Sequence, residues 1–149
     1  MKTLFDKASR QSLLDRAARL TPEAKAGWGK MNAEQMLAHL VEALKLGTGE
    51  VTTKPRKMLI RYPPLKQLII YVLPFPKGAP TAPELKRRES DAGTLARNRA
   101  ELARLLEDIG GRAGQKVWPE HPAFGKLSPR AWGVLGYRHA DHHLRQFGV

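Results

Sequence analysis

Residues 128–147 read SPRAWGVLGYRHADHHLRQF, and this stretch decides the fold because its spacing predicts one long helix. Ser128 is a favoured N-cap residue, and Pro129 suits the first helical position, where a backbone N–H is not needed. Successive residues of a helix are rotated by about 100°, which puts His139 and His143 near the middle of the apolar face. The stretch therefore predicts a helix that turns two histidines toward the core.

The two histidines of this helix are four residues apart, so their side chains lie one above the other and can reach a single metal ion. An imidazole buried without a partner is costly, so two of them on a core face need an explanation. His142 falls on the border between the two faces of the helix. We expect it to lie at the surface or to contact the metal ligands without binding the metal, with metal binding or proton transfer as weaker alternatives. The charged residues expected on the outer face are Arg138, Asp141 and Arg145.

A second predicted helix carries a third inward histidine. Asn32, followed three residues later by Gln35, predicts an N-cap, and the helix runs to about Leu46 before two glycines. His39 lies within its broad apolar arc, where a histidine alone is more often a hydrogen-bonded core residue than a ligand. Three inward histidines on two helices, however, supply the three nitrogen ligands of an open site that leaves a position for water or substrate.

Other polar residues are weaker candidates for the same site. Glu42 and Gln146 follow His39 and His143 by three residues, so each could contact a ligand or accept a proton there. For Glu42 the alternative is a solvated or interhelical polar contact, which we favour. His121 lies in a loop before the last helix, and we expect it to fix that loop, with proton transfer or a fourth ligand position as the alternative.

The rest of the chain predicts further helices and no strands. Residues 5–20 have helical spacing of leucine and alanine, and a helix that starts near Ser90 and Asp91 carries leucines inward up to Ile109. Residues 51–85 contain seven prolines, which disfavour regular helix, and only a short helix over 65–72 is expected there. We therefore predict an all-α fold: a four-helix bundle with one additional short helix and a proline-rich connection, forming a single domain over residues 1–149.

Composition limits the chemistry and the location. The chain has 149 residues, of which 42% are hydrophobic and 27% charged, as in ordinary folded proteins. It has no cysteine, so a metal site must use His, Asp or Glu. The first residues lack the features of a signal peptide, which predicts a cytoplasmic location. The most apolar run, residues 58–73, is short and interrupted by charges and prolines, so we expect no membrane partner.

The formal net charge of +12 would suit a polyanionic partner such as nucleic acid or an anionic membrane surface. The basic residues are, however, scattered along the chain, without the interleaved aromatic residues of a nucleic-acid-binding patch. We therefore expect a solvated basic surface. A non-catalytic basic helical module that binds nucleic acid or protein stays open as the alternative function, with the histidines serving structure.

Four segments together resemble a known group of proteins. They are WGKMNAEQMLAH (residues 28–39), PFPKG (74–78), HPAFG (121–125) and YRHADHHLRQFG (137–148). In their order they are similar to the DinB/YfiT-like superfamily, in a branch known only as a domain of unknown function. The resemblance implies a four-helix bundle in which His39, His139 and His143 hold a divalent metal ion, zinc or nickel above all. It also implies a homodimer, and thiol-dependent transferases and hydrolases as relatives.

The sequence thus favours a metal-dependent enzyme whose ion lowers the pKa of a bound water or thiol and so generates a nucleophile. The substrate would be a small molecule. We lean toward thiol-dependent transfer, on the resemblance alone, over hydrolysis. Because the chain has no cysteine, a low-molecular-weight thiol would have to arrive as cofactor or substrate. His121, His142 and Glu42 are the candidates for proton transfer.

Overall fold

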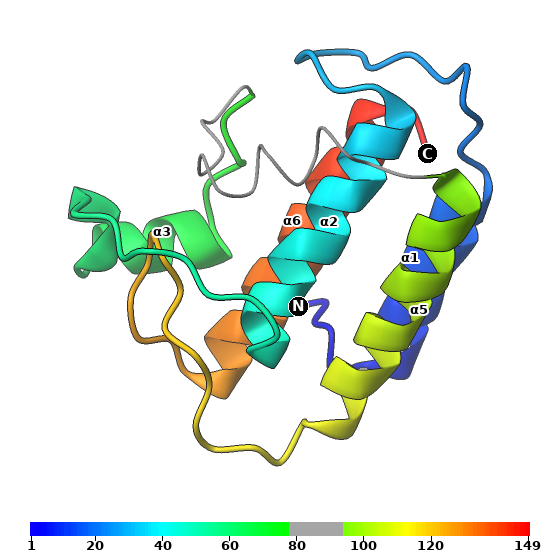
Figure 1. The fold of residues 1–149 in the computed structure, drawn as a ribbon. Coiled ribbons are helices and arrows are strands. Elements are labelled where there is room, and N and C mark those ends of the chain that lie inside the picture. Colours follow the sequence, from blue (N-terminus) through cyan, green and yellow to red (C-terminus); the bar gives the residue numbers. More distant parts are fainter. Residues whose placement is uncertain (78–93) are drawn as a thin grey trace.

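The computed structural model describes residues 1–77 and 94–149, and all their regular elements are helices (Figure 1). They are α1 (Lys7–Ala18), α2 (Ala33–Thr48), the short 3-10 helix η1 (Leu59–Arg61), α3 (Leu65–Tyr71), α5 (Leu95–Gly111) and α6 (Pro129–Gln146). The predicted all-α class is confirmed. In these residues no helix has the length and apolarity that a membrane crossing needs.

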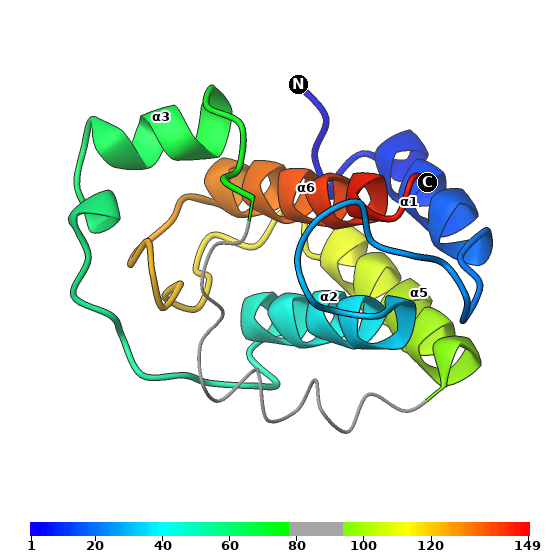
Figure 2. The same cartoon turned by 90° about the horizontal axis from the view of Figure 1, so that it is seen from above.

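The four long helices form a closed bundle, in which α2 packs against α5 and α6, and α1 packs against the same two partners from the other side. The short helix α3 lies outside this bundle, where it packs against α6 and η1 (Figure 2). The predicted arrangement of four principal helices and one additional short helix is therefore confirmed. Of the helical elements, η1 was not predicted from the sequence.

Two apolar clusters hold these helices together. The larger fills the bundle, with residues such as Leu37, Leu105 and Leu144 almost completely inaccessible to solvent. The smaller lies beneath α3, where Ile70 packs in a cluster with Val134 and other residues of α6. Burial of this apolar area is the main driving force for folding. Ile70, the buried residue of α3, therefore contributes to the attachment of this helix, together with the partly buried Ile69 and Tyr71.

Local sequence explains where the long helices begin. The Asn32 side chain accepts a hydrogen bond from Gln35 N at 2.8 Å, and the Gln35 side chain accepts one from Asn32 N, which completes a capping box. Ser128 caps α6 as predicted, with Pro129 in the first turn. Thr94 caps α5, whose predicted start near residues 90–91 lies outside the described residues.

The charged face of α6 differs from the expectation of an outer, solvated face. Asp141 forms an ion pair with Arg16 of α1 at 2.6 Å. Arg138 donates hydrogen bonds to backbone carbonyls of α3 and of the residues after it, Ile69 and Ile70 among them. The reason is that α6 contacts α1, α2 and α3, so most of its circumference is covered by protein. Only Arg145 of the three is exposed.

The N-terminal segment crosses α6 at close range. Leu4 N donates a hydrogen bond to Gly133 O at 3.0 Å. A methyl group built at Gly133 would lie 2.3 Å from the Thr3 hydroxyl and 2.7 Å from the Phe5 ring. A side chain at this position would therefore displace the segment.

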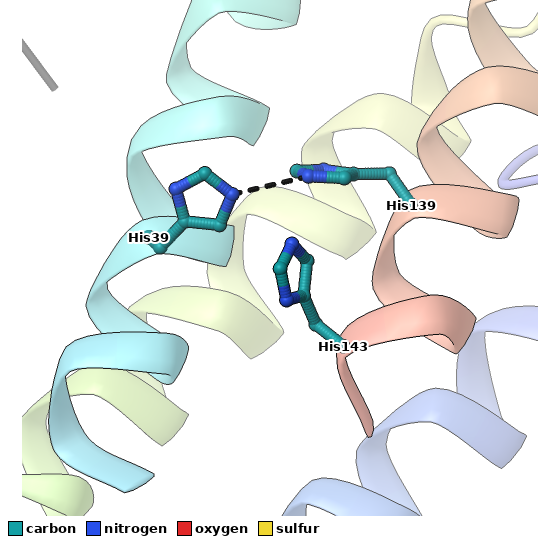
Figure 3. Close-up of side chains that lie close together, drawn as sticks. All are labelled: His39, His139 and His143. Atoms are coloured by element: carbon teal, nitrogen blue, oxygen red, sulfur yellow. Dashed lines mark hydrogen bonds between the residues drawn. The ribbon is translucent and has the colours of Figure 1, made fainter. Parts of the chain in front are cut away.

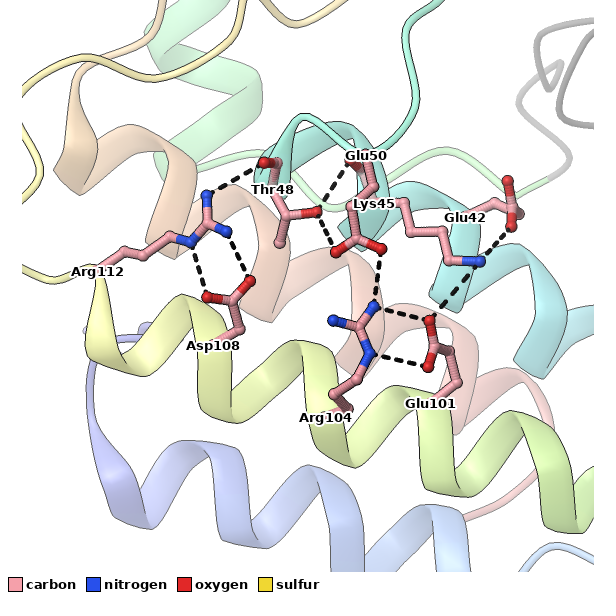
Figure 4. Close-up of polar contacts among 8 residues, drawn as sticks. All are labelled: Glu42, Lys45, Thr48, Glu50, Glu101, Arg104, Asp108 and Arg112. Carbon is pink, nitrogen blue, oxygen red and sulfur yellow. Dashed lines mark hydrogen bonds and ion pairs between the residues drawn. The ribbon is translucent and has the colours of Figure 1, made fainter.

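The helices α2 and α5 are joined at their surface by a polar network (Figure 4). Lys45 lies 3.1 Å from Glu42 and 3.7 Å from Glu101. Arg104 pairs with Glu101 and with Glu50, both at 2.8 Å. The hydrogen bond from Arg104 is the main cause of the lowered pKa of Glu101. Exposed pairs of this kind contribute little individually, so the network chiefly fixes how α2 lies on α5.

Candidate metal centre

Three histidines meet where α2 faces α6 (Figure 3). His39 comes from the middle of α2, and His139 and His143 come from successive turns of α6. One ring nitrogen of each residue lies within 4.8 Å of those of the other two. The closest approach is 3.1 Å, between the Nε2 atoms of His39 and His139. The structure thus brings together the three residues that the helical spacing and the resemblance selected.

This donor set fits a divalent metal ion. With metal–nitrogen bonds of about 2.0–2.1 Å, the ligand nitrogens of a tetrahedral centre lie roughly 3.3 Å apart, so small side-chain shifts would complete the geometry here. Imidazole nitrogens suit zinc, nickel, copper and iron alike. Among residues 1–77 and 94–149, three protein ligands meet at this point, and a set of three leaves one position for an exogenous molecule, the pattern of catalytic rather than structural zinc sites.

The environment keeps two of the rings in the neutral form that a ligand requires. Burial, followed by the proximity of His143 and His39, holds the pKa of His139 well below 6.5. Burial and the proximity of His39 lower the pKa of His143 to about 4. Both rings are therefore neutral at physiological pH, and metal binding there requires little proton release.

The orientation of His143 is fixed by a neighbour on its own helix. Its Nδ1–H donates to the Gln146 side-chain oxygen at 2.8 Å, which leaves Nε2 as the lone-pair atom. The Gln146 amide in turn donates to Trp28 O at 2.5 Å, and Gly27 N donates to Gln146 O at 2.7 Å. Gln146 is 3% exposed. The loop before α2 thereby holds the His143 ring in place, an arrangement typical of the hydrogen bonds that orient histidines in metal sites.

One side of the histidine group is open. His39 is buried, whereas His139 and His143 are partly exposed. The expectation that these two lie in the middle of a buried face was therefore only approximate, because the α6 face between α2 and α3 is not fully covered. His142 borders the open side, with its ring 5.2 Å from that of His143.

Aromatic and basic residues surround this opening. Trp28 and Phe75 lie 5.5 and 5.9 Å from His142, measured between ring centroids. The Lys77 ammonium lies 4.6 Å from the Trp28 ring centre, and the Arg138 guanidinium lies 5.1 Å from that of Phe75. Burial lowers the pKa of His142, while the nearby Asp141 carboxylate opposes this shift and Lys77 adds to it. The opening thus combines flat apolar surfaces with positive charge.

A family model described as the DinB superfamily matches residues 6–147 of this chain. The chain belongs to the DinB superfamily. The superfamily is known as metal-binding, in agreement with the histidine group of this member. No curated protein and no solved structure matches the chain significantly.

In this DinB superfamily protein, His121 lies in the loop that precedes α6. Its Nδ1 accepts hydrogen bonds from Ala123 N at 3.1 Å and from Phe124 N at 3.2 Å. Its ring packs against Trp132, with centroids 5.3 Å apart. Burial and the nearby Arg61 guanidinium lower its pKa to about 4. These contacts give His121 the loop-fixing part that its sequence context indicates, and its ring is not one of the three that meet at the centre.

Glu42 lies in the polar network between α2 and α5, where it pairs with Lys45. It is not part of the cluster of ligand atoms around His39. The ion pair between Glu42 and Lys45 lies within α2, and Lys45 in turn contacts Glu101 of α5, so Glu42 takes part in a polar contact of the kind favoured from the sequence. Trp28 and Phe75, by contrast, border the opening, although no pattern in the sequence predicts that they lie there. Their only signal was membership of the segments that carry the superfamily resemblance.

Proposed function

We propose that this protein is a metal-dependent enzyme in which His39, His139 and His143 bind one divalent ion, zinc or nickel. The single observation that supports this best is a group of three imidazoles, within ligand distance of one another, that is partly exposed on one side. An ion held there would lower the pKa of a water or thiol at the open position, which suits hydrolysis or thiol-dependent transfer.

The residues around the centre have distinct parts in this proposal. Gln146 keeps the His143 ring oriented. His142, beside the open position, is the best-placed proton acceptor of the three candidates, because His121 uses Nδ1 within its loop and Glu42 pairs with Lys45. Trp28 and Phe75 would bind the apolar part of a small substrate.

Charge at the opening favours an anionic substrate or thiol. Lys77 and Arg138 contribute positive charge through their contacts with Trp28 and Phe75. Asp141, whose negative charge acts on His142, is itself paired with Arg16 and Arg145. A negatively charged ligand would therefore be attracted to the same side from which the three histidines are reached. The proposal therefore includes a preference for an anionic substrate or thiol, and a preference for thiol-dependent transfer over hydrolysis.

X-ray absorption spectroscopy of the zinc-loaded protein tests the open position. We expect three imidazole nitrogens at about 2.0–2.1 Å, and one sulfur at about 2.3 Å after addition of a small anionic thiol. Lys77→Gln should weaken binding of the anionic thiol relative to a neutral one while leaving the nitrogen shell unchanged. A closed, four-coordinate shell that no thiol enters would contradict a catalytic role and would leave metal binding itself intact.

A further inference from the structure

The exposed apolar surface of this protein is concentrated in one segment. Six of the eight large hydrophobic side chains exposed in residues 1–77 and 94–149 lie between residues 58 and 73. Leu59 is 81% exposed, Val72 67% and Tyr62 66%, and the others are Met58, Leu68 and Leu73. Single exposed hydrophobic residues are normal, but a cluster of this kind marks an interaction surface.

These side chains belong to the part of the structure that projects from the bundle. Leu68 of α3 and Val72, the residue that follows this helix, are both exposed, whereas Ile70 between them is buried against α6. On and beside η1, Leu59 and Tyr62 are three residues apart, and η1 packs against α3. Figures 1 and 2 both show α3 and the adjacent η1 outside the four long helices. We call these six exposed residues the apolar face.

All charged residues in the segment that carries the apolar face are basic. From Val51 to Lys77 the sequence contains no Asp or Glu, and its basic residues are Lys54, Arg56, Lys57, Arg61, Lys66 and Lys77. Lys54, Lys57 and Lys77 are exposed. Arg61 differs from these lysines because its side chain is bound to the loop before α6. It lies 3.6 Å from Glu120 and donates a hydrogen bond to Pro122 O. Exposed lysines therefore flank the apolar face in the sequence, with Lys54 and Lys57 before it and Lys77, which also contacts Trp28, after it. The segment has no negative charge of its own to compensate them.

We propose that the apolar face docks on an anionic lipid surface, with Leu59, Tyr62, Leu68 and Val72 in the interfacial region and the flanking lysines on the headgroups. Exposed aliphatic and tyrosine side chains next to lysines are the combination that binds peripheral elements to such surfaces. A second copy of this chain would bring two basic rims together, and nucleic acid would leave the aliphatic side chains without an apolar partner.

This contact is parallel to the membrane and needs no spanning helix. The sequence-based expectation of no membrane partner rested on the lack of a spanning segment and on the scatter of basic residues along the chain. The first does not test surface binding, and the second does not show where the basic residues lie in the fold. The proposal is independent of the metal centre, because no residue of the apolar face belongs to the histidine group. Binding that relies on both insertion and charge should be weakened by removing either one.

Co-sedimentation of the full chain with vesicles tests the proposal. One set of vesicles contains phosphatidylcholine only, and the other contains phosphatidylcholine with a large fraction of phosphatidylglycerol. We expect binding to the anionic vesicles alone. Leu59→Ser should lower the partition coefficient about tenfold, and Lys57→Gln about fivefold. These residues are on the surface, so the variants should unfold like the wild type.

Lys116 and Val117 provide a matched control, since Lys116 is exposed and Val117 is 81% exposed, as Leu59 is. Val117→Ser and Lys116→Gln should leave the partition coefficient unchanged. The proposal is overturned if the wild type does not bind anionic vesicles, or if the two pairs of variants lose binding equally. It is also overturned if the wild type is a dimer that does not bind vesicles and that Leu59→Ser dissociates. Salt-sensitive binding to duplex DNA with no vesicle binding would equally overturn it.

Discussion

At the level of single residues, the three histidines of the centre are held in different ways. His39 is buried on α2, whereas the His143 ring is oriented by the hydrogen bond to Gln146, which is itself bound to Trp28 O. Sequence spacing could predict that His139 and His143 lie on one face of a helix. It could not predict the Trp28 contact, because that contact joins positions 118 residues apart.

The Gln146 side chain should therefore influence metal affinity without binding the metal. Gln146→Leu removes the acceptor of the His143 Nδ1–H, and we expect metal affinity to fall by about 10–100-fold. Competition with a chromogenic chelator measures this change. Gln146→Glu keeps an acceptor for His143 but loses the donor to Trp28 O, so it should retain most of the affinity. Equal losses in both variants would contradict the orienting part of Gln146.

His121 makes stability depend on pH. Its pKa is about 4 in the folded protein, compared with 6.5 for an ordinary histidine. Between pH 4 and pH 6.5 the unfolded chain therefore binds more protons than the folded protein does. The contribution of neutral His121 to stability is complete above about pH 6.5 and is lost as the pH falls toward 4. His121→Asn keeps an acceptor for the two backbone N–H groups but does not titrate.

We accordingly expect the free energy of unfolding of His121→Asn to fall less than that of the wild type from about pH 7 to about pH 5. Urea denaturation at each pH provides the comparison. His121→Ala, which removes the acceptor as well, should be less stable than His121→Asn across the whole range. Parallel pH profiles for wild type and His121→Asn would show that His121 is not the titrating group.

At the level of helices, local sequence was the most informative source. The N-caps at Asn32 and Ser128 and the short helix after two prolines were all predictable, because each depends on neighbours only a few residues away. The contacts made by the charged face of α6 were not predictable from local sequence. Their partners, Arg16 and the backbone carbonyls of α3, are distant in sequence. A helix wheel shows which residues share a face, but it does not show how many faces the rest of the fold covers.

The crossing of the N-terminal segment over α6 gives a test at this level. Gly133→Ala would place a methyl group against Thr3 and Phe5, and we expect it to destabilise the fold by about 1–3 kcal/mol through overpacking. Gly111→Ala, at the end of α5, meets nothing within 4 Å and should stabilise the helix by about 0.5–1 kcal/mol. Urea denaturation of both variants should give changes of opposite sign.

At the level of the whole molecule, the metal centre joins two helices that are far apart in sequence. The sequence indicated three inward histidines, but bringing His39 next to His139 depends on the packing of α2 on α6, which local patterns do not specify. The superfamily resemblance supplied that pairing before the fold was known. An ion bound to all three ligands would connect these helices and stabilise the folded state over the unfolded one.

Metal should consequently raise the thermal stability of the domain. At free zinc about 1,000 times the dissociation constant, the expected gain is about 4 kcal/mol, which corresponds to a rise in Tm of roughly 10 °C. Differential scanning fluorimetry with zinc and with a chelator measures the shift. His39→Ala should abolish it, while Arg145→Ala, on the exposed side of α6, should retain it.

The central claim is that His39, His139 and His143 together bind one divalent ion, and metal content measured by mass spectrometry tests it most directly. We predict about one ion per chain for the wild type after loading with zinc and removal of excess metal. His142→Ala, next to the centre, should keep that ion, and His143→Ala should lose it. A wild type that retains no metal, or a His143→Ala variant that retains as much as the wild type, would contradict the account.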